Sequence, residues 1–510
     1  MAEKHFEIET FSHNFKVTVL TGLGRDIIRR FGSQFIQYQF SRKRGESFRT
    51  IAAVYSTREG RSNVFRFHIN QLPGFLEMIK GSFLDEDSYT ITAHEPNLGV
   101  EVKLEVRPEW VLRPHQIEIP GFLNDPSETN QLVGIQTGKG KTVSALYSAA
   151  QVGRRTGIVV RAQFTSQWAQ ACLDTLKLKR KDVMVIKGGE ALEKVLDLAR
   201  KKKLKAKILI FSNKTLQAYL KAFEGNPELF VNLGHTHPQE IYPTLGIGLI
   251  INDEVHLDFH LNYCMYSYMH TGRSYALSAT LIDDDQFMER MYSIVFPKKN
   301  RFGGGEYVKY VATTAVLWNL YTPQKIRTTE YGSTTYSHTA FEKSIAKHIP
   351  TLNNYMRLID DVVNIGFVRH KDRQPGFRLL ILVATIDFAT RLTKFLREQH
   401  PDLDIRRYVD DDPYENLLEP DIRVSTILSS GTGHDIKKLF CTIMTTGVRS
   451  PKSNLQAFGR TREMSDGTTP RFYYMACKDI PKQMDYHFAK SELLKSRSAS
   501  FYTDVLPRVV

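Results

Sequence analysis

The chain has 510 residues, more than one hydrophobic core usually supports, so its length predicts two or three domains. Its net charge of +14 favours polyanionic partners such as nucleic acid, although an anionic membrane surface would attract the same charge. The sequence has no apolar run near the roughly 20 residues of a membrane-spanning helix, and its first residues lack a signal peptide's apolar core. The four scattered cysteines form no CxxC pair, which argues against a zinc ribbon or a disulfide framework. We therefore expect a protein of a reducing cytoplasm.

Residues 1–106 alternate strand-like runs with two helical segments, which predicts a small α+β module. Two of its expected hairpin tips are basic, and the first contains Arg42, Lys43 and Arg44. Side chains of this kind at a hairpin tip can contact the phosphates of a duplex. Basic hairpin ends are also common as plain solvated turns, so both interpretations stay open for this module.

From residue 107 the pattern changes to short apolar runs separated by helical stretches, such as GIVVRA, AKILIFS and GLIINDE. Continuous apolar strands that alternate with helices are typical of a parallel sheet covered on both faces. The same pattern returns after a glycine-rich segment that ends near residue 305. We therefore predict an α/β protein with two parallel-sheet domains, 107–305 and 306–510, behind the small module.

A loop rich in glycine and lysine lies between the strand LVGIQ and the helical run VSALYSAAQ of the first α/β domain. Backbone N–H groups of such a loop, at the start of a helix, bind phosphate oxygens, while a lysine neutralises their charge and a hydroxyl holds magnesium. The strict phosphate-loop pattern requires glycine where this chain has Ile135, so a basic surface turn is the alternative. The candidate phosphate-binding residues are Thr137, Gly138, Lys139, Gly140, Lys141 and Thr142.

Two carboxylates, Asp253 and Glu254, follow the apolar strand GLIIN. A parallel sheet presents its ligands at the carboxyl ends of its strands, so Asp253 can hold magnesium and Glu254 can activate the attacking water. A lone acidic pair would be an ordinary strand end, but this pair lies downstream of a candidate phosphate loop. His256 and His260 are spaced like zinc ligands, yet neither an HExxH frame nor a third ligand accompanies them.

Two further motifs complete an ordered series: Ser278-Ala279-Thr280 after the strand YAL, and QAFGRTR, from Gln456 to Arg462, in the second α/β domain. The series resembles the motifs of superfamily 2 helicases and translocases of the DExH type. This resemblance implies two RecA-like domains, ATP and Mg²⁺ as cofactors, and a nucleic-acid-stimulated ATPase or helicase activity. An arginine-rich turn alone would be an unremarkable solvated loop.

The resemblance also implies a role for each matching residue. Gln116, in the run RPHQ, would contact adenine, and Thr142 with Asp253 would hold the metal. The implied catalytic residues are Lys141, Asp253, Glu254, Arg460 and Arg462, with Arg462 as the arginine finger, because a guanidinium offers several donors to the spreading phosphoryl charge. The run SSGTGHDIK would place Gly433 and Asp435 near the nucleotide, and the implied coupling residues are Ser278, Thr280 and Gln456.

Contact with nucleic acid has weaker motifs. In the run GIVVRAQFTSQWAQ, Arg161-Ala162 stands where the family usually has Pro-Thr, and Thr165 and Gln167 remain candidate contacts. We interpret Trp168 as a core anchor for its helix. Ser212 likewise stands where threonine is common in the next motif.

Within the superfamily, a small basic module directly before the motor resembles the phage recombination helicases. This implies ATP-dependent remodelling of branched DNA, by fork or junction unwinding or by branch migration, and removal of RNA paired to DNA. It further implies a role in phage recombination, repair or replication in the host bacterial cytoplasm, and we expect a monomer. The alternatives are a nucleic-acid-binding ATP clamp without productive unwinding, an RNA or RNA–DNA helicase, and the motor subunit of a restriction system.

Overall fold

The computed structural model describes residues 3–510 except 44–45, 61, 137, 279–285, 304–307, 333, 410–411, 414, 428, 430–435 and 465, and it describes no side chains at 40–48 and 452. Contacts within the chain divide it into two compact units. The first comprises Met1–Ile135 and Lys139–Gly305, and the second comprises Gln136–Gly138 and Glu306–Val510. Among the described helices, none has both the length and the apolarity needed to cross a membrane.

A seven-stranded, all-parallel sheet forms the centre of the first unit, with the strand order β10-β11-β9-β12-β13-β8-β14. Its strands are β8 (Asn130–Gly134), β9 (Thr156–Val160), β10 (Val183–Ile186), β11 (Ile208–Ser212), β12 (Leu249–Asn252), β13 (Arg273–Ser278) and β14 (Arg301–Gly303). Its helices are α3 (Glu118–Leu123), α4 (Lys141–Val152), α5 (Thr165–Thr175), α6 (Gly189–Arg200), α7 (Asn213–Gly225), α8 (Pro227–Asn232), α9 (Ile241–Leu245), α10 (Phe259–Tyr266) and α11 (Gln286–Val295).

Helices cover both faces of this sheet, which explains why its strands are apolar at successive positions. In β11, Ile208 and Ile210 face a hydrophobic cluster with α3, α4 and α5. Leu209 and Phe211, which alternate with them, face a second cluster that includes α6, α7, α9, α10 and α11. The period of two in a strand thus delivers one apolar set to each layer of helices.

The second unit contains another seven-stranded, all-parallel sheet, with the order β17-β18-β16-β19-β20-β15-β21. Its strands are β15 (Ala312–Asn319), β16 (Arg378–Val383), β17 (Ile405–Tyr408), β18 (Ile422–Thr426), β19 (Leu439–Met444), β20 (Arg471–Cys477) and β21 (Ser500–Val509). Its helices are α12 (His338–Ile345), α13 (Ile349–Val363), α14 (Ile386–Gln399), α15 (Glu415–Leu418), α16 (Pro451–Phe458) and α17 (Pro481–Lys495), and they cover both faces.

The two sheets have the same topology. If the strands of each are numbered along the chain, both sheets read 3-4-2-5-6-1-7 from edge to edge. Two parallel sheets with this order are RecA-like domains, so the fold predicted from the alternating apolar runs is confirmed.

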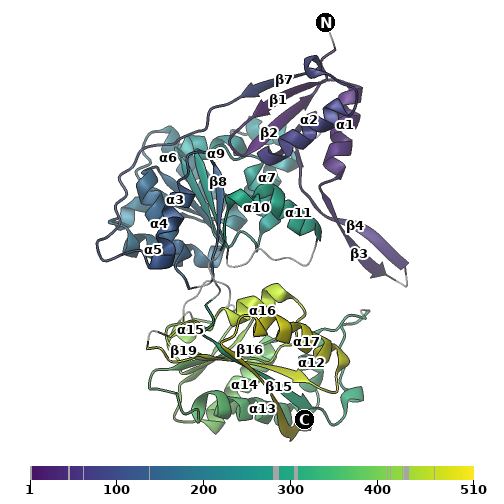
Figure 1. Ribbon diagram of the computed structural model, residues 1–510, viewed down its shortest axis with the longest axis vertical. Helices are drawn as coiled ribbons and strands as arrows, with labels where there is room; N and C mark the ends of the chain where they lie inside the picture. Colours follow the sequence, from purple (N-terminus) through teal and green to yellow (C-terminus); the bar gives the residue numbers. More distant parts are fainter. Residues whose placement is uncertain are drawn as a thin grey trace. The chain divides into compact units, whose positions relative to one another are not determined.

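A third, mixed sheet with the order β5-β6-β2-β1-β7 precedes them (Figure 1). Its strands are β1 (Phe6–Thr10), β2 (Asn14–Val19), β5 (Thr57–Arg58), β6 (Val64–His68) and β7 (Tyr89–Ala93), with helices α1 (Gly22–Ser33) and α2 (Leu72–Lys80). The strands β3 (Ile36–Lys43) and β4 (Glu46–Val54) pair only with each other and form a separate antiparallel ribbon (Figure 1). This region is the α+β module expected before the two parallel sheets.

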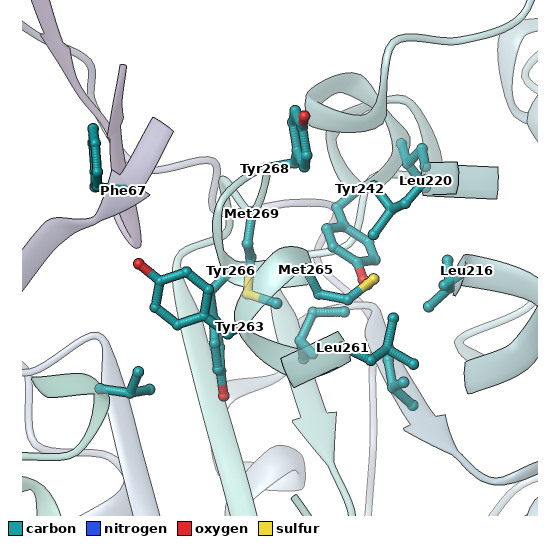
Figure 2. Close-up of a cluster of buried hydrophobic side chains, with 14 of the residues drawn as sticks. Phe67, Leu216, Leu220, Tyr242, Leu261, Tyr263, Met265, Tyr266, Tyr268 and Met269 are labelled. Atoms are coloured by element: carbon teal, nitrogen blue, oxygen red, sulfur yellow. The ribbon is translucent and has the colours of Figure 1, made fainter. Parts of the chain in front are cut away.

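The mixed sheet shares a hydrophobic core with the first parallel sheet. One buried cluster runs from Phe67 on β6, past Tyr263 and Tyr266 on α10, to Leu216 on α7 (Figure 2). Polar contacts reinforce this cluster. The buried side chain of Asn14 donates to the carbonyl of Tyr266 at 3.1 Å and to the carbonyl of Met269 at 2.8 Å. The N-terminal sheet is therefore fixed to α10, the helix that follows Asp253 and Glu254.

Candidate active site

The glycine-rich loop lies between β8 and α4, as the sequence predicts. Gly138 has φ 85° and Gly140, the residue before α4, has φ 83°, a left-handed conformation that costs little only for glycine. The N-cap residue of the 12-residue α4 is Gly140, which has no side chain to cap the first turn. The N-terminal N–H groups of α4 are therefore directed at the loop, where an anion can accept from them. Thr137 lies outside the described residues.

Ile135 is a core residue. Its side chain is 7% exposed and belongs to the cluster between the sheet and helices α3 to α5. Its carbonyl accepts from Nζ of Lys141 at 3.2 Å, and Lys141 itself is 9% exposed. The bulky residue at the start of the loop thus packs inward, and its backbone holds the lysine.

Gln116 forms hydrogen bonds that hold the glycine-rich loop. Its Oε1 accepts from the N–H of Arg113 at 2.9 Å, and its Nε2 donates to the carbonyl of Gly140 and to Oγ of Ser144, both at 3.1 Å. A Cβ atom at position 140 would clash with that Nε2, and the backbone there has φ 83°, so glycine suits both the contact and the turn. A ring nitrogen of His115 lies 3.0 Å from the carbonyl of Lys139. Gln116 therefore sets the shape of the loop.

Asp253 lies directly after β12 and is partly buried. Its Oδ1 accepts from the N–H of Glu254 at 2.9 Å, and its Oδ2 accepts from Nε1 of Trp168 at 2.8 Å. Burial, and then the charge of Glu254, raise the pKa of Asp253 to about 7, against the opposing effects of the Trp168 hydrogen bond and of Lys141.

Glu254 adopts a left-handed backbone with φ 48°, a strained conformation for a residue with a side chain. Its carboxylate lies 3.4 Å from Nδ1 of His256, which in turn lies 2.8 Å from Oγ of the fully buried Ser278. A polar chain thus joins the carboxylate after β12 to the hydroxyl at the end of β13. Thr280 lies outside the described residues.

The two spaced histidines do not converge. The ring of His260 lies 2.9 Å from the carbonyl of Val54, whereas His256 faces Glu254 and Ser278. Across the described part of the chain, no three His, Cys, Asp or Glu side chains are grouped so that they could bind a metal ion.

Arg161, which departs from the family motif, forms a two-pronged ion pair with Asp258, with N–O distances of 2.8 and 3.2 Å. Nδ2 of Asn213 donates to the same carboxylate at 2.9 Å. The contacts join the ends of β9 and β11 to the start of α10. Of the two candidate nucleic-acid contacts nearby, Gln167 is exposed, whereas Thr165 is fully buried and donates its hydroxyl to the carbonyl of Ala162 at 2.9 Å.

In the second unit, Gln456 lies on α16, and Arg460 and Arg462 lie in the turn that follows it. Both arginines are partly exposed. Thr461, between them, is fully buried and its Oγ1 donates to the hydroxyl of Thr442 on β19 at 3.0 Å. This bond holds the arginine turn at the sheet. Gly433 and Asp435 lie outside the described residues, as does Arg44, and the side chains of Arg42 and Lys43 are not described either.

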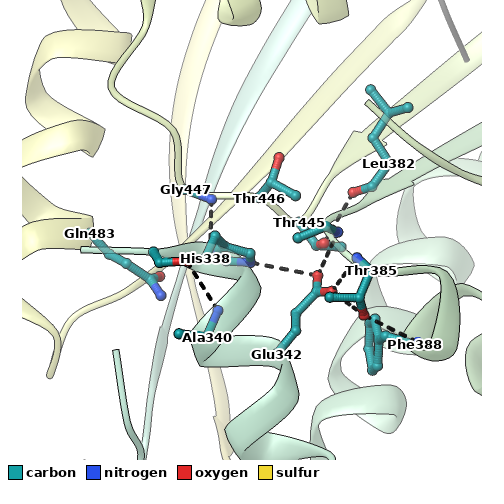
Figure 3. Close-up of polar contacts among 12 residues, drawn as sticks. His338, Ala340, Glu342, Leu382, Thr385, Phe388, Thr445, Thr446, Gly447 and Gln483 are labelled. Atoms are coloured by element: carbon teal, nitrogen blue, oxygen red, sulfur yellow. Dashed lines mark hydrogen bonds and ion pairs between the residues drawn. The ribbon is translucent and has the colours of Figure 1, made fainter. Parts of the chain in front are cut away.

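A polar cluster at the carboxyl edge of the second sheet was not recognised in the sequence analysis (Figure 3). The buried carboxylate of Glu342, on α12, accepts from the N–H groups of Ala384 and Thr385, both at 2.8 Å. Nδ1 of His338 accepts from the N–H of Gly447 at 3.0 Å, and its Nε2 lies 3.7 Å from Glu342. Burial raises the pKa of Glu342 to about 7 and lowers that of His338 to about 3. A His-x-x-x-Glu pair on one helix was the only available sequence signal.

Sequence reasoning also missed the partner of Trp168. Its indole lies in the core cluster, as expected, but it also donates to the candidate metal ligand 85 residues away. A tryptophan two turns from a strand end gives no sign of such a bond in the sequence.

We compared the chain with protein families, curated proteins and solved structures. No family model matches the chain, and no curated protein matches it in sequence. Among solved structures, Dbp5 of S. cerevisiae bound to RNA and ADP BeF3 aligns with 12% identity over 77% of this chain and 89% of that chain, with a TM-score of 0.50. Mss116p bound to ssRNA and AMP-PNP aligns with 15% identity over 77% and 74%, with a TM-score of 0.51. T4 UvsW aligns over 98% and 99% with 11% identity and a TM-score of 0.35.

The chain therefore shares its fold, two RecA-like parallel-sheet domains, with Dbp5 and Mss116p. Three of the motifs that the sequence suggested lie at strand ends: the glycine loop after β8, the Asp253-Glu254 pair after β12, and Ser278 at the end of β13. Gln116 lies instead in a short helical turn, and Gln456 lies on α16.

Proposed function

We propose that the protein is an ATP-dependent helicase or translocase that remodels branched DNA, by fork or junction unwinding or by branch migration. The observation that carries the proposal is the arrangement at the carboxyl ends of β12, β13 and β8, three neighbouring strands. These ends present Asp253 and Glu254, Ser278, and the loop with Lys141. In this proposal residues 1–106 grip duplex, 107–305 bind ATP, and 306–510 complete the motor.

ATP would bind with its phosphates at the N-terminus of α4, where the loop N–H groups and Lys141 offer donors and positive charge. Gln116 would contact the adenine, and Thr137, Gly138, Lys139 and Gly140 would surround the phosphates. The hydroxyl of Thr142 and the carboxylate of Asp253 are oxygen donors of the kind that Mg²⁺ prefers, so these residues fit the metal. When bound, Mg²⁺ neutralises phosphate charge.

Hydrolysis would use Glu254 to orient and deprotonate the attacking water, and Arg460 and Arg462 to donate to the charge that spreads over the phosphoryl oxygens. The contacts from Glu254 through His256 to Ser278 support a role of Ser278, with Thr280 and Gln456, in coupling hydrolysis to movement. Gly433 and Asp435 would lie near the nucleotide.

DNA contact would involve the basic N-terminal module and the exposed Gln167 on α5. The β3–β4 ribbon carries Arg42, Lys43 and Arg44 in its sequence, and the guanidinium of Arg49 lies 3.6 Å from the ring centre of Tyr38. A ribbon that combines cationic and aromatic groups suits a nucleic-acid strand, since phosphates attract the cations and bases stack on the rings.

A first test measures ATP turnover with and without single-stranded DNA. We expect DNA to stimulate ATP turnover. Lys141→Ala should abolish this turnover, because the variant lacks the buried cation that is proposed to bind the phosphates. Lys194→Ala is the matched control, since it removes the same charge from an exposed position on α6 with a side chain 72% exposed. Wild-type protein that binds ATP without DNA-stimulated turnover would instead be an ATP clamp.

RNA is the second candidate substrate, because the Dbp5 and Mss116p structures contain RNA. Strand displacement should therefore be compared on a DNA fork, a four-way DNA junction, a simple DNA duplex, an RNA duplex and an RNA–DNA hybrid. Preference for the fork and junction supports branched-DNA remodelling. Activity on RNA duplex with none on branched DNA would replace it with an RNA helicase.

A further inference from the structure

Each carboxylate oxygen of Asp253 has one hydrogen-bond donor from the protein. The donor to Oδ1 is the N–H of Glu254, which is the next residue of the same loop. The donor to Oδ2 is the indole Nε1 of Trp168, which comes from a different element, α5. Trp168 therefore fixes the direction of this side chain relative to the rest of the sheet.

The position of Trp168 is itself well determined. The side chain is 3% exposed and packs in the cluster that contains Phe164 and Cys172. The helix α5 follows β9, and β9 pairs directly with β12, where the N–H of Asp253 donates to the carbonyl of Val159 at 3.1 Å. The indole thus lies on the helix that follows β9, Asp253 follows the neighbouring strand β12, and the 2.8 Å hydrogen bond joins the two side chains.

We propose that Trp168 is a positioning residue for the metal-binding carboxylate, and that its indole N–H holds Asp253 in the rotamer that binds magnesium. The proposal rests on the proposed function, because it assigns a role within the same nucleotide site. An indole N–H suits the task because it donates but cannot accept, so it always presents a proton to the carboxylate. A hydrogen bond to an ionised acceptor is also stronger than a neutral one.

Outer partners of metal ligands commonly contribute about 10- to 100-fold to metal affinity. If the indole donor is lost, Oδ2 has no protein donor and the side chain can rotate about its Cα–Cβ bond. We therefore expect weaker magnesium binding with little change in the rate at saturating magnesium, since the catalytic groups themselves are intact. A purely structural tryptophan would give the opposite result, a loss of stability with an unchanged magnesium requirement.

The chain supplies its own control. Trp110 also donates through Nε1, at 2.8 Å, but to the backbone carbonyl of Asp174, and its residue surface is 37% exposed. Removal of its donor takes away an indole hydrogen bond of the same length that does not involve the site.

The test replaces Trp168 by 3-benzothienylalanine, which keeps the shape of the indole and substitutes sulfur for the N–H, and makes the same replacement at Trp110. The probes are Mg²⁺ and a fluorescent non-hydrolysable ATP analogue, whose binding is titrated with Mg²⁺ alongside ATP turnover. We expect the Mg²⁺ concentration at half-saturation to rise about tenfold or more at position 168, with maximal turnover within about twofold, and no change at position 110. An unchanged midpoint at position 168 would overturn the proposal.

The result separates the two proposals. Wild-type protein that shows no Mg²⁺-dependent binding of the analogue contradicts the proposed function itself, whatever Trp168 does. Trp168→Phe serves as a second variant, because it keeps an aromatic ring in the core and also lacks the donor. If its thermal stability falls while its Mg²⁺ midpoint stays at the wild-type value, the residue is a core anchor and the positioning role is wrong.

Discussion

The two parallel sheets have the same strand order, but different polar groups follow equivalent strands at their carboxyl edges. After β8, the first strand of its sheet, the chain turns through Gly138 and Gly140 and leaves the start of α4 without a side-chain cap. After β15, the first strand of the other sheet, Oδ2 of Asp479 accepts from the N–H of Leu320 at 2.7 Å and from Nδ2 of Asn319 at 3.0 Å. The second sheet thus supplies its own carboxylate where the first leaves donors for a phosphate.

The fifth strands differ in the same way. The strand β12 is followed by Asp253, whose carboxylate can bind a cation, whereas β19 is followed by the buried Thr445, whose hydroxyl donates to the carbonyl of Leu382 at 3.0 Å. The comparison teaches that the topology provides equivalent positions at the sheet edge, and that a few residues after each strand decide whether a nucleotide can use them. We therefore expect one nucleotide for each chain.

The largest effect should come from Glu254, which follows β12 in the first sheet. Glu254→Gln keeps the size of the side chain but removes the proposed base, so we expect ATP turnover to fall by about 10³-fold or more while nucleotide binding persists. Turnover and the binding of a fluorescent ATP analogue measure the two properties. Turnover close to the wild-type rate would remove Glu254 from the mechanism.

Ile135→Gly tests whether Ile135 stabilises the hydrophobic core or obstructs nucleotide binding at the loop. Because the side chain is buried, we expect a free energy of unfolding lower by about 3–5 kcal/mol, without tighter nucleotide binding. Ile135→Val, which removes one methylene, should cost about 1 kcal/mol and serves as the graded control. Denaturant titration measures stability, and stronger nucleotide binding by the glycine variant would show that Ile135 obstructs the loop.

Acid should weaken the first unit through His68. Burial lowers the pKa of His68 to about 3, from 6.5 in an unfolded chain, and its Nε2 has no hydrogen-bond partner among the described residues. The unfolded state binds the proton more readily, so the free energy of unfolding falls once the pH drops below 6.5 and continues to fall toward pH 3.

His68→Asn should reduce the stability lost between pH 7 and pH 5 by about 2 kcal/mol. Asparagine is suitable because its side-chain oxygen can replace Nδ1 of His68, which accepts from the N–H of Asn70. Denaturant titrations of both proteins at each pH measure the difference, and identical pH slopes would contradict the prediction.

The smallest effect should come from the carboxylate of the second sheet. Asp479→Ala leaves the N–H of the buried Leu320 without its protein acceptor, so we expect a loss of about 1 kcal/mol in stability. Nucleotide stoichiometry and affinity, measured by calorimetry, should not change, because no glycine loop follows β15. A second bound nucleotide in this variant would show that Asp479 alone excludes it.

Much of the architecture was predictable from local pattern. Runs such as AKILIFS indicated strands buried on both faces, and β11 buries Ile208 and Leu209 against opposite helix layers. The irregular segment near residue 303 was not recognised as β14, and the final edge strand β21 was also missed, because edge strands have only one partner and show a weaker apolar pattern. The contact of the N-terminal sheet with α10 joins positions about 250 residues apart, which local periodicity does not report.

The class of fold, the loop, the carboxylate pair and the arginine turn were predicted from the amino-acid sequence alone, because each of these depends on neighbouring residues and their spacing. Tertiary structure decided that Ile135 faces the core, that Asp479 closes the second sheet edge, and that Trp168 donates to Asp253. These three facts depend on which strand ends lie side by side, and side-chain direction at a strand end is set by packing between distant segments. The sequence of the glycine loop alone is therefore compatible with a basic surface turn. Its position near the carboxyl end of β12 makes it part of a candidate ATP site.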